Sequence, residues 1–202
     1  MSYSTMLIVP EIGPLEAIAE FGNAWGFGPR IWNAIAESFM PSGWNWIMTA
    51  GSYKSRVFWN LVSDPLLAKC ERLTHAITYD RVICERDKAT QMAEMLREFD
   101  ARHPAPCQHV NHLIGIADAL EKNAEKPCVG FAWIVTSVTD DVWDVKDVCL
   151  EAFHDRERTG YCEMCGNQWS DRQCFRTFDW SKDREKNLHF MLFERYGERR
   201  TE

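Results

Sequence analysis

The feature that most constrains this chain is a pair of cysteines separated by two residues and followed by a glycine. Cys162, Cys165 and Gly166 form this motif. Two thiolates at this spacing can bind one metal ion from a tight turn, and the glycine lets the backbone bend back towards the sulfurs. The motif therefore predicts a zinc knuckle. Because two ligands do not complete a tetrahedral site, the chain must supply two more.

Further cysteine and histidine residues lie on both sides of this pair. We expect Cys174 to be the third ligand and either His154 or Cys149 to be the fourth. The types and spacing of these residues favour a structural zinc. Free thiols and a catalytic zinc are the alternatives, and the catalytic zinc would need an open coordination position and a nearby acid or base. The metal could also be iron, since the sequence alone does not distinguish the two.

Two other groups of residues can be interpreted as metal ligands, but each has a simpler interpretation. Cys107, His109 and His112 lie at the expected start of a helix, where polar residues on a solvated face are common. Four carboxylates follow the expected central strand and could bind Mg²⁺ or Ca²⁺. They are Asp140, Asp141, Asp144 and Asp147. The apolar residues between them favour a solvated turn that leads into an amphipathic segment.

Composition limits the class of protein. The chain has 202 residues, which is enough for one domain with a sizeable core. Its formal net charge of −7 argues against binding of nucleic acid irrespective of sequence, because such binding needs a basic surface. No transmembrane helix and no signal peptide are predicted. We therefore expect a cytoplasmic protein whose eight cysteines are reduced thiols or metal ligands.

Hydrophobic periodicity predicts a mixture of helices and strands. Apolar residues recur at helical spacing in six segments, near residues 15–21, 29–39, 54–61, 65–77, 88–99 and 110–120. The expected apolar face of the fifth segment consists of Ala89, Met92, Ala93, Leu96 and Phe99, and that of the sixth consists of Val110, Leu113, Ile114, Ala117 and Leu120. In the fourth segment, Asp64 and Pro65 resemble a helix cap followed by proline at the first helical position. Short apolar runs rich in β-branched and aromatic residues predict strands near residues 5–9, 79–84, 129–138 and 188–195, with 129–138 at the centre of a sheet.

These elements predict a single α+β domain over residues 1–202. We expect a sheet of about four mostly antiparallel strands with helices packed on it. Residues 145–180 are expected to form a zinc-stapled insertion between two neighbouring strands. A polar stretch of this length without packing of its own would be unusual inside a compact domain. A bound metal ion would stabilise its structure.

The chain contains nine tryptophans, which is a high number for its length. Trp44 and Trp46 are two residues apart in a stretch with glycine and serine, so in an extended segment both would point to the same side. Two exposed indoles would form an anchor for a partner protein. The alternative is that both fold onto the domain. Trp133 and Phe190 are expected to be buried in adjacent strands of one sheet.

Two stretches of the chain resemble uncharacterised proteins of phages and bacterial mobile elements. The first is residues 21–26 together with Trp32, and the second is residues 135–143 with the sequence VTSVTDDVW. The resemblance spans roughly residues 15–143 and the last strand, and the cysteine-rich stretch lies outside it. It implies an accessory protein of the bacterial or phage cytoplasm that acts by binding a component of the host or of its defence.

The sequence therefore favours protein binding without catalysis, such as inhibition of a host defence complex. A metal-dependent hydrolase or nuclease that uses the zinc ligands or the carboxylates is the first alternative. A nucleic-acid binder that uses the zinc-stapled insertion is the second. The partner protein and the oligomeric state do not follow from the sequence.

Overall fold

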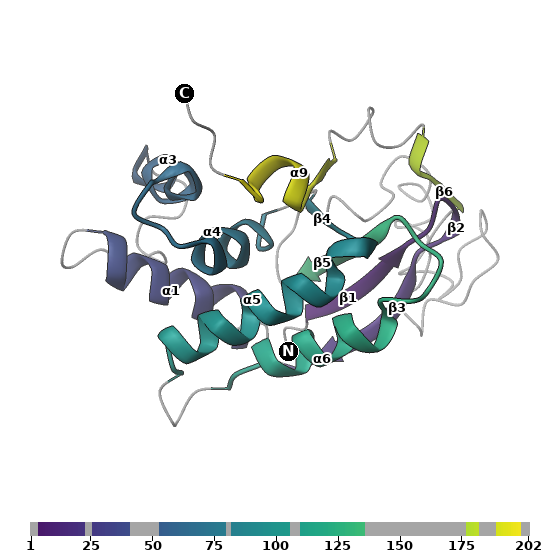
Figure 1. The fold of residues 1–202 in the computed structure, drawn as a ribbon, viewed down its shortest axis with the longest axis horizontal. Coiled ribbons are helices and arrows are strands. Elements are labelled where there is room, and N and C mark those ends of the chain that lie inside the picture. Colours follow the sequence, from purple (N-terminus) through teal and green to yellow (C-terminus); the bar gives the residue numbers. More distant parts are fainter. Residues whose placement is uncertain are drawn as a thin grey trace, which may run out of the picture.

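The computed structural model describes residues 4–22, 26–40, 53–79, 82–105, 110–135, 177–181 and 189–198. These residues form an α+β architecture in which helices pack on a five-stranded mixed sheet (Figure 1). The α+β class expected from the sequence is confirmed, and the main sheet has five strands where about four were expected. Most of the expected insertion lies outside the described residues.

The five-stranded sheet has the order β3-β1-β5-β4-β7. Its strands are β1 (Ser4–Val9), β3 (Glu16–Phe21), β4 (Val82–Glu85), β5 (Gly130–Val135) and β7 (Phe190–Met191). The pairs β1–β3, β1–β5 and β4–β5 are antiparallel, whereas β4 and β7 are parallel. The central place of β5 was expected from its apolar run. A second, two-stranded sheet joins β2 (Ile12–Pro14) to β6 (Thr177–Asp179).

The described part of the chain contains six α-helices and two single turns of 3-10 helix. The helices are α1 (Gly28–Phe39), α3 (Tyr53–Asn60), α4 (Lys69–Ala76), α5 (Ala89–Arg102), α6 (Leu113–Asn123) and α9 (Leu192–Tyr196). The 3-10 turns are η2 (Leu61–Ser63) and η3 (Arg86–Lys88). The apolar face expected on α5 is confirmed, because Ala89, Met92, Ala93, Leu96 and Phe99 are its buried residues.

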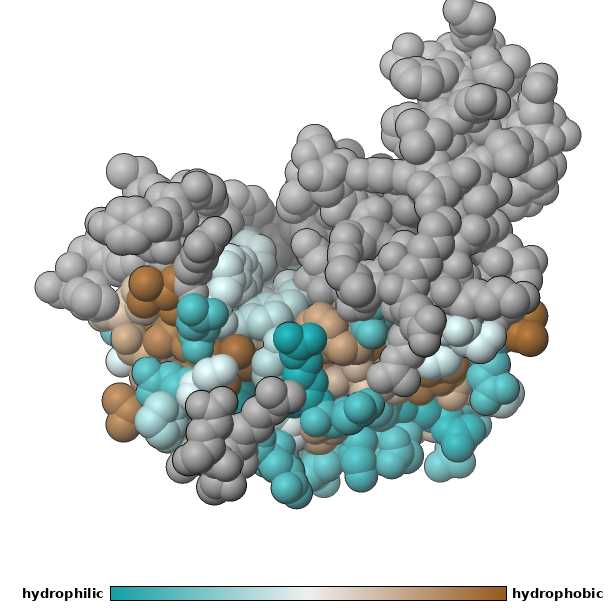
Figure 2. Space-filling view, turned by 90° about the horizontal axis from the view of Figure 1, so that it is seen from above, coloured by the Kyte–Doolittle hydropathy of each residue, from teal (hydrophilic) through white to brown (hydrophobic). Residues whose placement is uncertain are grey.

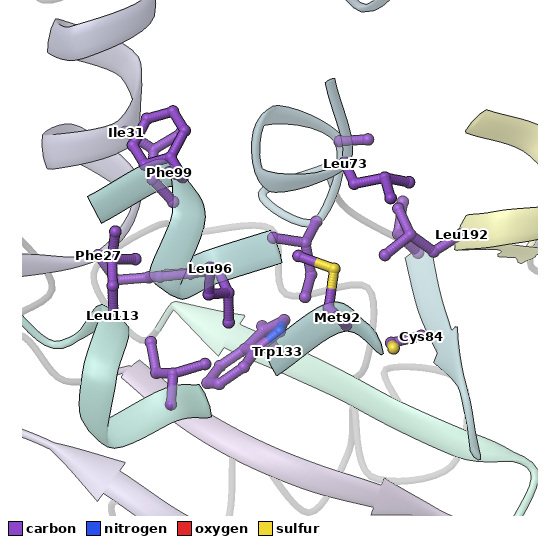
Figure 3. Packing of buried hydrophobic residues seen from close by; sticks show 14 of the residues in the cluster. Phe27, Ile31, Leu73, Cys84, Met92, Leu96, Phe99, Leu113, Trp133 and Leu192 are labelled. Carbon is purple, nitrogen blue, oxygen red and sulfur yellow. The ribbon is translucent and has the colours of Figure 1, made fainter. Parts of the chain in front are cut away.

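Alternate residues of β1, β4 and β5 point to opposite faces of the sheet, and both sets are buried. In β1, Met6 and Ile8 belong to the main core with the helices, whereas Leu7 and Val9 belong to a smaller cluster on the opposite face. Figure 3 shows the main core, in which Trp133 from β5 lies among side chains of α5 and α6. The smaller cluster includes Leu15 and packs against Trp180 and other half-buried residues. This alternation is the two-residue period of a strand.

A buried network of charged groups joins α1, α4 and α5. Arg30 of α1 forms an ion pair with Asp100 of α5 and also donates to the carbonyl of His103 at 2.9 Å. The Nε2 of His103 lies 3.0 Å from Oε1 of Glu71 in α4, and Oε2 of that carboxylate accepts the N–H of Ala68 at 2.7 Å. The carboxylates of Glu71 and Asp100 both have partners in this network, so it joins the three helices without leaving either carboxylate unpaired.

A close backbone approach explains the glycine at the start of β5. Gly130 pairs with Glu85 of β4, and a Cβ atom built on Gly130 would lie 2.1 Å from the carbonyl oxygen of Cys84. No side chain fits in that space, so glycine lets the two strands pair where β5 begins.

Residues 15–21 were predicted to be a helix, and this prediction is wrong. They form the edge strand β3, which pairs with β1 through the register Met6–Ala19. The apolar spacing of Leu15, Ile18 and Ala19 fits a helix, but hydrogen bonding to the buried β1 decides the structure. The chain between β1 and β3 includes Gly13, whose φ of 137° is a conformation that other residues rarely adopt.

Four smaller predictions are corrected. Trp133 is buried as expected, but Phe190 is only half-buried and β4 lies between their strands. The strand expected at residues 188–195 is limited to β7, and α9 follows it at once. The strand expected at residues 79–84 is β4 and begins at Val82. The helix expected after Asp64 begins only at Lys69.

The predicted apolar face of α6 is partly wrong. Val110 and Ile114 were expected on it, but their side chains are 45% and 40% exposed. The other three expected residues, Leu113, Ala117 and Leu120, are buried, and Ile116 is buried in place of Ile114. The helix begins at Leu113, so the face that meets the core is rotated relative to the one read from the sequence.

Candidate functional site

The residues that the sequence nominates for metal and partner binding lie outside the described residues. They are Cys149, His154, Cys162, Cys165 and Cys174 for the metal, and Trp44 and Trp46 for the partner. The same holds for Cys107, His109 and the four carboxylates that follow β5. His112 is described, and its ring lies 5.1 Å from that of Phe21 between centroids. Within the described ranges, no group of three or more metal-binding side chains comes together. The metal site stays a prediction.

Three cysteines are described, and all three are free thiols. They are Cys70, Cys84 and Cys128. Burial raises the pKa of the Cys70 thiol to about 11, and it also raises the pKa of Cys84 and of Cys128. A thiol with a raised pKa is protonated at neutral pH, and the protonated form is a poor nucleophile and a poor metal ligand. These three residues therefore contribute to packing.

The site that the structure does define is a cleft bordered by α3, η2, α4 and α9. It has a volume of about 480 Å³, which falls in the range of about 300–1,000 Å³ that is typical of ligand pockets. Figure 1 shows α3 and α9 on two sides of α4. The aromatic and charged residues that give the cleft its character are Trp59, Asp64, Arg72, Tyr79, Arg195 and Tyr196.

One wall of the cleft, α9, comes from the far end of the chain and is held at both of its ends. The two oxygens of the Glu85 carboxylate accept the N–H groups of Phe193 at 2.9 Å and Glu194 at 2.8 Å. At the other end, Nε of Arg72 donates to the carbonyl of Tyr196 at 2.8 Å. A carboxylate at a helix N-terminus and a cation at its C-terminus are the charges that the helix dipole favours.

Aromatic rings form the floor and the facing walls of the cleft. The ring of Trp59 stacks on that of His75, with centroids 5.5 Å apart and planes inclined by 4°. The Tyr79 hydroxyl donates to the carbonyl of Trp59, and the Tyr79 ring meets Tyr196 edge-on at 5.8 Å. Burial raises the pKa of Tyr79, so its hydroxyl stays protonated and keeps this bond. These contacts fix the three lining rings relative to one another.

Arg195 is the exposed cation among the described residues that line the cleft. The central carbon of its guanidinium lies 4.3 Å from the centroid of the Phe190 ring and 5.6 Å from that of Tyr196. Its side chain is exposed, and no carboxylate within the described ranges forms an ion pair with it. Arg72, by contrast, is buried and donates to backbone carbonyls. Arg195 therefore offers donors to a molecule that enters the cleft.

His75 lies beneath the cleft and is not part of its lining. Burial lowers the pKa of His75 to about 4, and its Nε2 lies 3.2 Å from the carbonyl oxygen of Phe58. At neutral pH the imidazole is therefore uncharged, and it supports Trp59 from below. The described lining combines aromatic rings and the guanidinium of Arg195 with the carboxylates of Asp64 and Glu198.

Sequence reasoning missed this cleft. Arg195 and Tyr196 stand in a C-terminal stretch of mixed charge that carries no motif. The bond from Arg72 to Tyr196 joins residues 124 positions apart, so only the folded chain brings them together. The abundance of tryptophan was the one available signal, since Trp59 is one of the nine.

No protein-family model, curated protein or solved structure gives a significant match to this chain. The longest described helix, α5, has 14 residues, whereas a helix that crosses a bilayer needs about 20 predominantly apolar ones. Over the ranges that the structure describes, no helix meets that requirement.

Proposed function

We propose that this protein acts by binding a protein partner, without turnover, and that the cleft forms part of the binding surface. The observation that carries the proposal is the lining, in which Trp59, Tyr79 and Tyr196 share one cleft with the exposed guanidinium of Arg195. Tryptophan, tyrosine and arginine are the residue types that contribute most to the free energy of protein–protein binding. Because the surrounding contacts fix these rings, little entropy is lost when a partner binds.

Exposed apolar side chains beside the cleft support a protein partner. Leu66 is 77% exposed and directly follows Pro65, which lines the cleft. Val57 is 51% exposed and lies on α3, two residues before Trp59. Figure 2 shows such hydrophobic residues standing among hydrophilic ones on the described surface. Single exposed apolar residues are common, so these two extend the site rather than define it.

The resemblance to accessory proteins of phages and mobile elements supports a host protein, such as a component of a defence complex, as the partner. The alternatives are a metal-dependent hydrolase or nuclease and a zinc-dependent nucleic-acid binder. Both depend on residues 136–176, which lie outside the described ranges. A hydrolytic activity that a change of Cys162 or Asp141 abolishes would favour the first alternative and contradict binding without turnover.

The proposed zinc site predicts the metal content of the purified protein. We expect about one zinc ion per chain, bound by Cys162, Cys165 and Cys174 with His154 or Cys149. Elemental analysis of the protein measures this ratio, and Cys70→Ser is the matched control because that thiol is buried and separate from the predicted ligands. A metal-free protein in which the thiols of the three predicted cysteine ligands titrate freely would disprove the site.

Filling the cleft is predicted to block partner binding without unfolding the protein. Ser63 is exposed and lines the cleft, so Ser63→Trp would place a bulky side chain in the space that the partner occupies. We expect capture of the partner to fall by about tenfold or more. Ser38 is an exposed serine on α1 outside the lining, and Ser38→Trp is the matched control.

The measurement compares proteins captured from one host lysate by the wild-type chain and by both variants, with quantification by mass spectrometry. Melting temperatures of all three proteins establish that they are folded. Equal recovery of every captured protein by Ser63→Trp and the wild type would show that the cleft does not bind the partner.

A further inference from the structure

The charges of the described residues that line the cleft balance one another, but they are not equally available. Arg72 and Arg195 contribute two positive charges, and Asp64 and Glu198 contribute two negative ones. The carboxylate of Asp64 accepts the N–H of Leu66 at 2.8 Å, so part of its bonding capacity is used within the protein. Arg72 is buried and donates to backbone carbonyls. Among the described lining residues, Arg195 is left as the exposed charged donor.

The guanidinium of Arg195 is also held in place before any ligand arrives. It lies over the Phe190 ring at 4.3 Å and beside Tyr196. A guanidinium that packs on an aromatic face keeps the N–H groups of its edge free, and these donors match the two oxygens of a carboxylate. Stacking of this kind lowers the entropy that arginine loses when it binds an anion.

The geometry points to a carboxylate side chain of the partner protein, next to an aromatic or apolar side chain, as the group that enters this cleft. This inference rests on the proposed function and names the chemistry of the partner. The carboxylate would accept from Arg195, and the neighbouring side chain would pack against the rings of Trp59 and Tyr79.

A carboxylate suits the cleft better than a phosphate because of the acidic groups that line it. Asp64 and Glu198 repel any anion, and the repulsion is about twice as large for a dianionic phosphate as for a singly charged carboxylate. One available guanidinium neutralises a single charge. The ring faces supply the remaining attraction, which acts on an apolar side chain rather than on a second charge.

The test uses four short capped peptides as probes. The first is acetyl-Glu-Phe-amide, and the second is acetyl-Gln-Phe-amide, which has nearly the same shape without the charge. The third is acetyl-phosphoserine-Phe-amide, and the fourth is acetyl-Phe with a free terminal carboxylate. Binding is followed by NMR on the full chain, through the Nε–H signal of Arg195 and the indole N–H signal of Trp59. Arg195→Gln and Trp59→Phe assign these signals.

We expect the glutamate peptide to shift both signals in a saturable way. The glutamine peptide should bind about tenfold more weakly or worse, because it loses a charge-assisted pair of hydrogen bonds. The phosphoserine peptide should also bind more weakly than the glutamate peptide. Arg195→Gln should remove the preference for glutamate over glutamine. Arg86→Gln is the matched control, since Arg86 is exposed and does not line the cleft, and it should leave all affinities unchanged.

Several results would overturn the inference. Equal affinity for the glutamate and glutamine peptides, or absence of any saturable shift, would show that the cleft does not select a carboxylate. Tighter binding of the phosphoserine peptide would identify a phosphorylated partner instead. A preference for acetyl-Phe over the glutamate peptide would identify the chain terminus of a partner as the source of the carboxylate, which contradicts a side chain.

Partner capture separates a failure of this inference from a failure of the proposed function. If Ser63→Trp abolishes capture and Arg195→Gln leaves it unchanged, the cleft binds the partner without using a carboxylate. If neither variant changes capture, the cleft is not the binding surface, and the proposed function fails with it. If Ser63→Trp and Arg195→Gln both reduce capture and Arg86→Gln does not, the inference and the proposed function are both supported.

Discussion

Replacing Trp133 by alanine is expected to lower the free energy of unfolding by about 3–5 kcal/mol, which is the range for removal of a large aromatic side chain from a core. The Trp133 side chain is 7% exposed, and its ring centroid lies 4.9 Å from that of Phe27. Figure 3 shows it among Leu96 of α5 and Leu113 of α6. Its removal would therefore leave a cavity at the junction of the sheet and two helices. Chemical denaturation of the two proteins measures the difference.

Two further variants control for this result. Trp133→Phe keeps an aromatic ring and removes an indole N–H that is buried without a hydrogen-bond partner in the described structure. This change is expected to cost less than about 1.5 kcal/mol. Ile114→Ala, at a side chain that is 40% exposed on α6, should change stability by about 0.5 kcal/mol or less. A cost of about 1 kcal/mol or less for Trp133→Ala would contradict the packing described here.

The helices and the central strand could be predicted because their patterns are local. In α5 every residue of the predicted apolar face is buried, and this helix spans four turns of regular spacing. The apolar run of β5 predicts a strand that is buried on both faces, and the structure places this strand between β1 and β4. Long periodic segments carry enough information to define both their type and their buried face.

The edge strands could not be predicted, because their structure depends on partners elsewhere in the chain. In β3, alanine and glutamate favour a helix, and the pairing with β1 overrides that preference. Near the C-terminus, the apolar run around Phe190 is divided between β7 and α9. The carboxylate of Glu85, more than 100 residues earlier, caps the first turn of this helix. No pattern within residues 188–195 contains that information.

The same reason explains why the sequence predicts metal ligands but does not predict the cleft. The spacing of Cys162 and Cys165 predicts a pair of metal ligands, because such spacing is a local pattern. The cleft has no local signature, because it forms only when α9 packs on α4 and brings Tyr196 beside Tyr79. None of its described residues belongs to a sequence motif, and they line one site only because the fold brings them together.

Lowering the pH from 7 to 4 is expected to destabilise the protein through His75. The pKa of an exposed histidine is about 6.5, whereas burial lowers that of His75 to about 4 in the folded protein. Between these two values the unfolded chain binds a proton that the folded protein does not, so stability falls as the pH falls. The contribution is fully present above pH 6.5, and it is lost progressively down to pH 4. The full difference between the two pKa values corresponds to about 3 kcal/mol in the free energy of unfolding.

The variant His75→Phe isolates this effect from other groups that titrate in the same range. Phenylalanine can occupy the space between Trp59 and Phe58, where the His75 ring makes its contacts. It loses the hydrogen bond to the Phe58 carbonyl, so the variant is expected to be less stable than the wild type at pH 7. It cannot take up a proton, however, so the unfolding free energy of the wild type should fall by about 3 kcal/mol relative to that of the variant between pH 6.5 and pH 4. Urea denaturation at a series of pH values measures this difference. Parallel decreases in the two proteins would mean that His75 is accessible to protons in the folded state, and the ring beneath Trp59 would then lie nearer to water than its burial indicates.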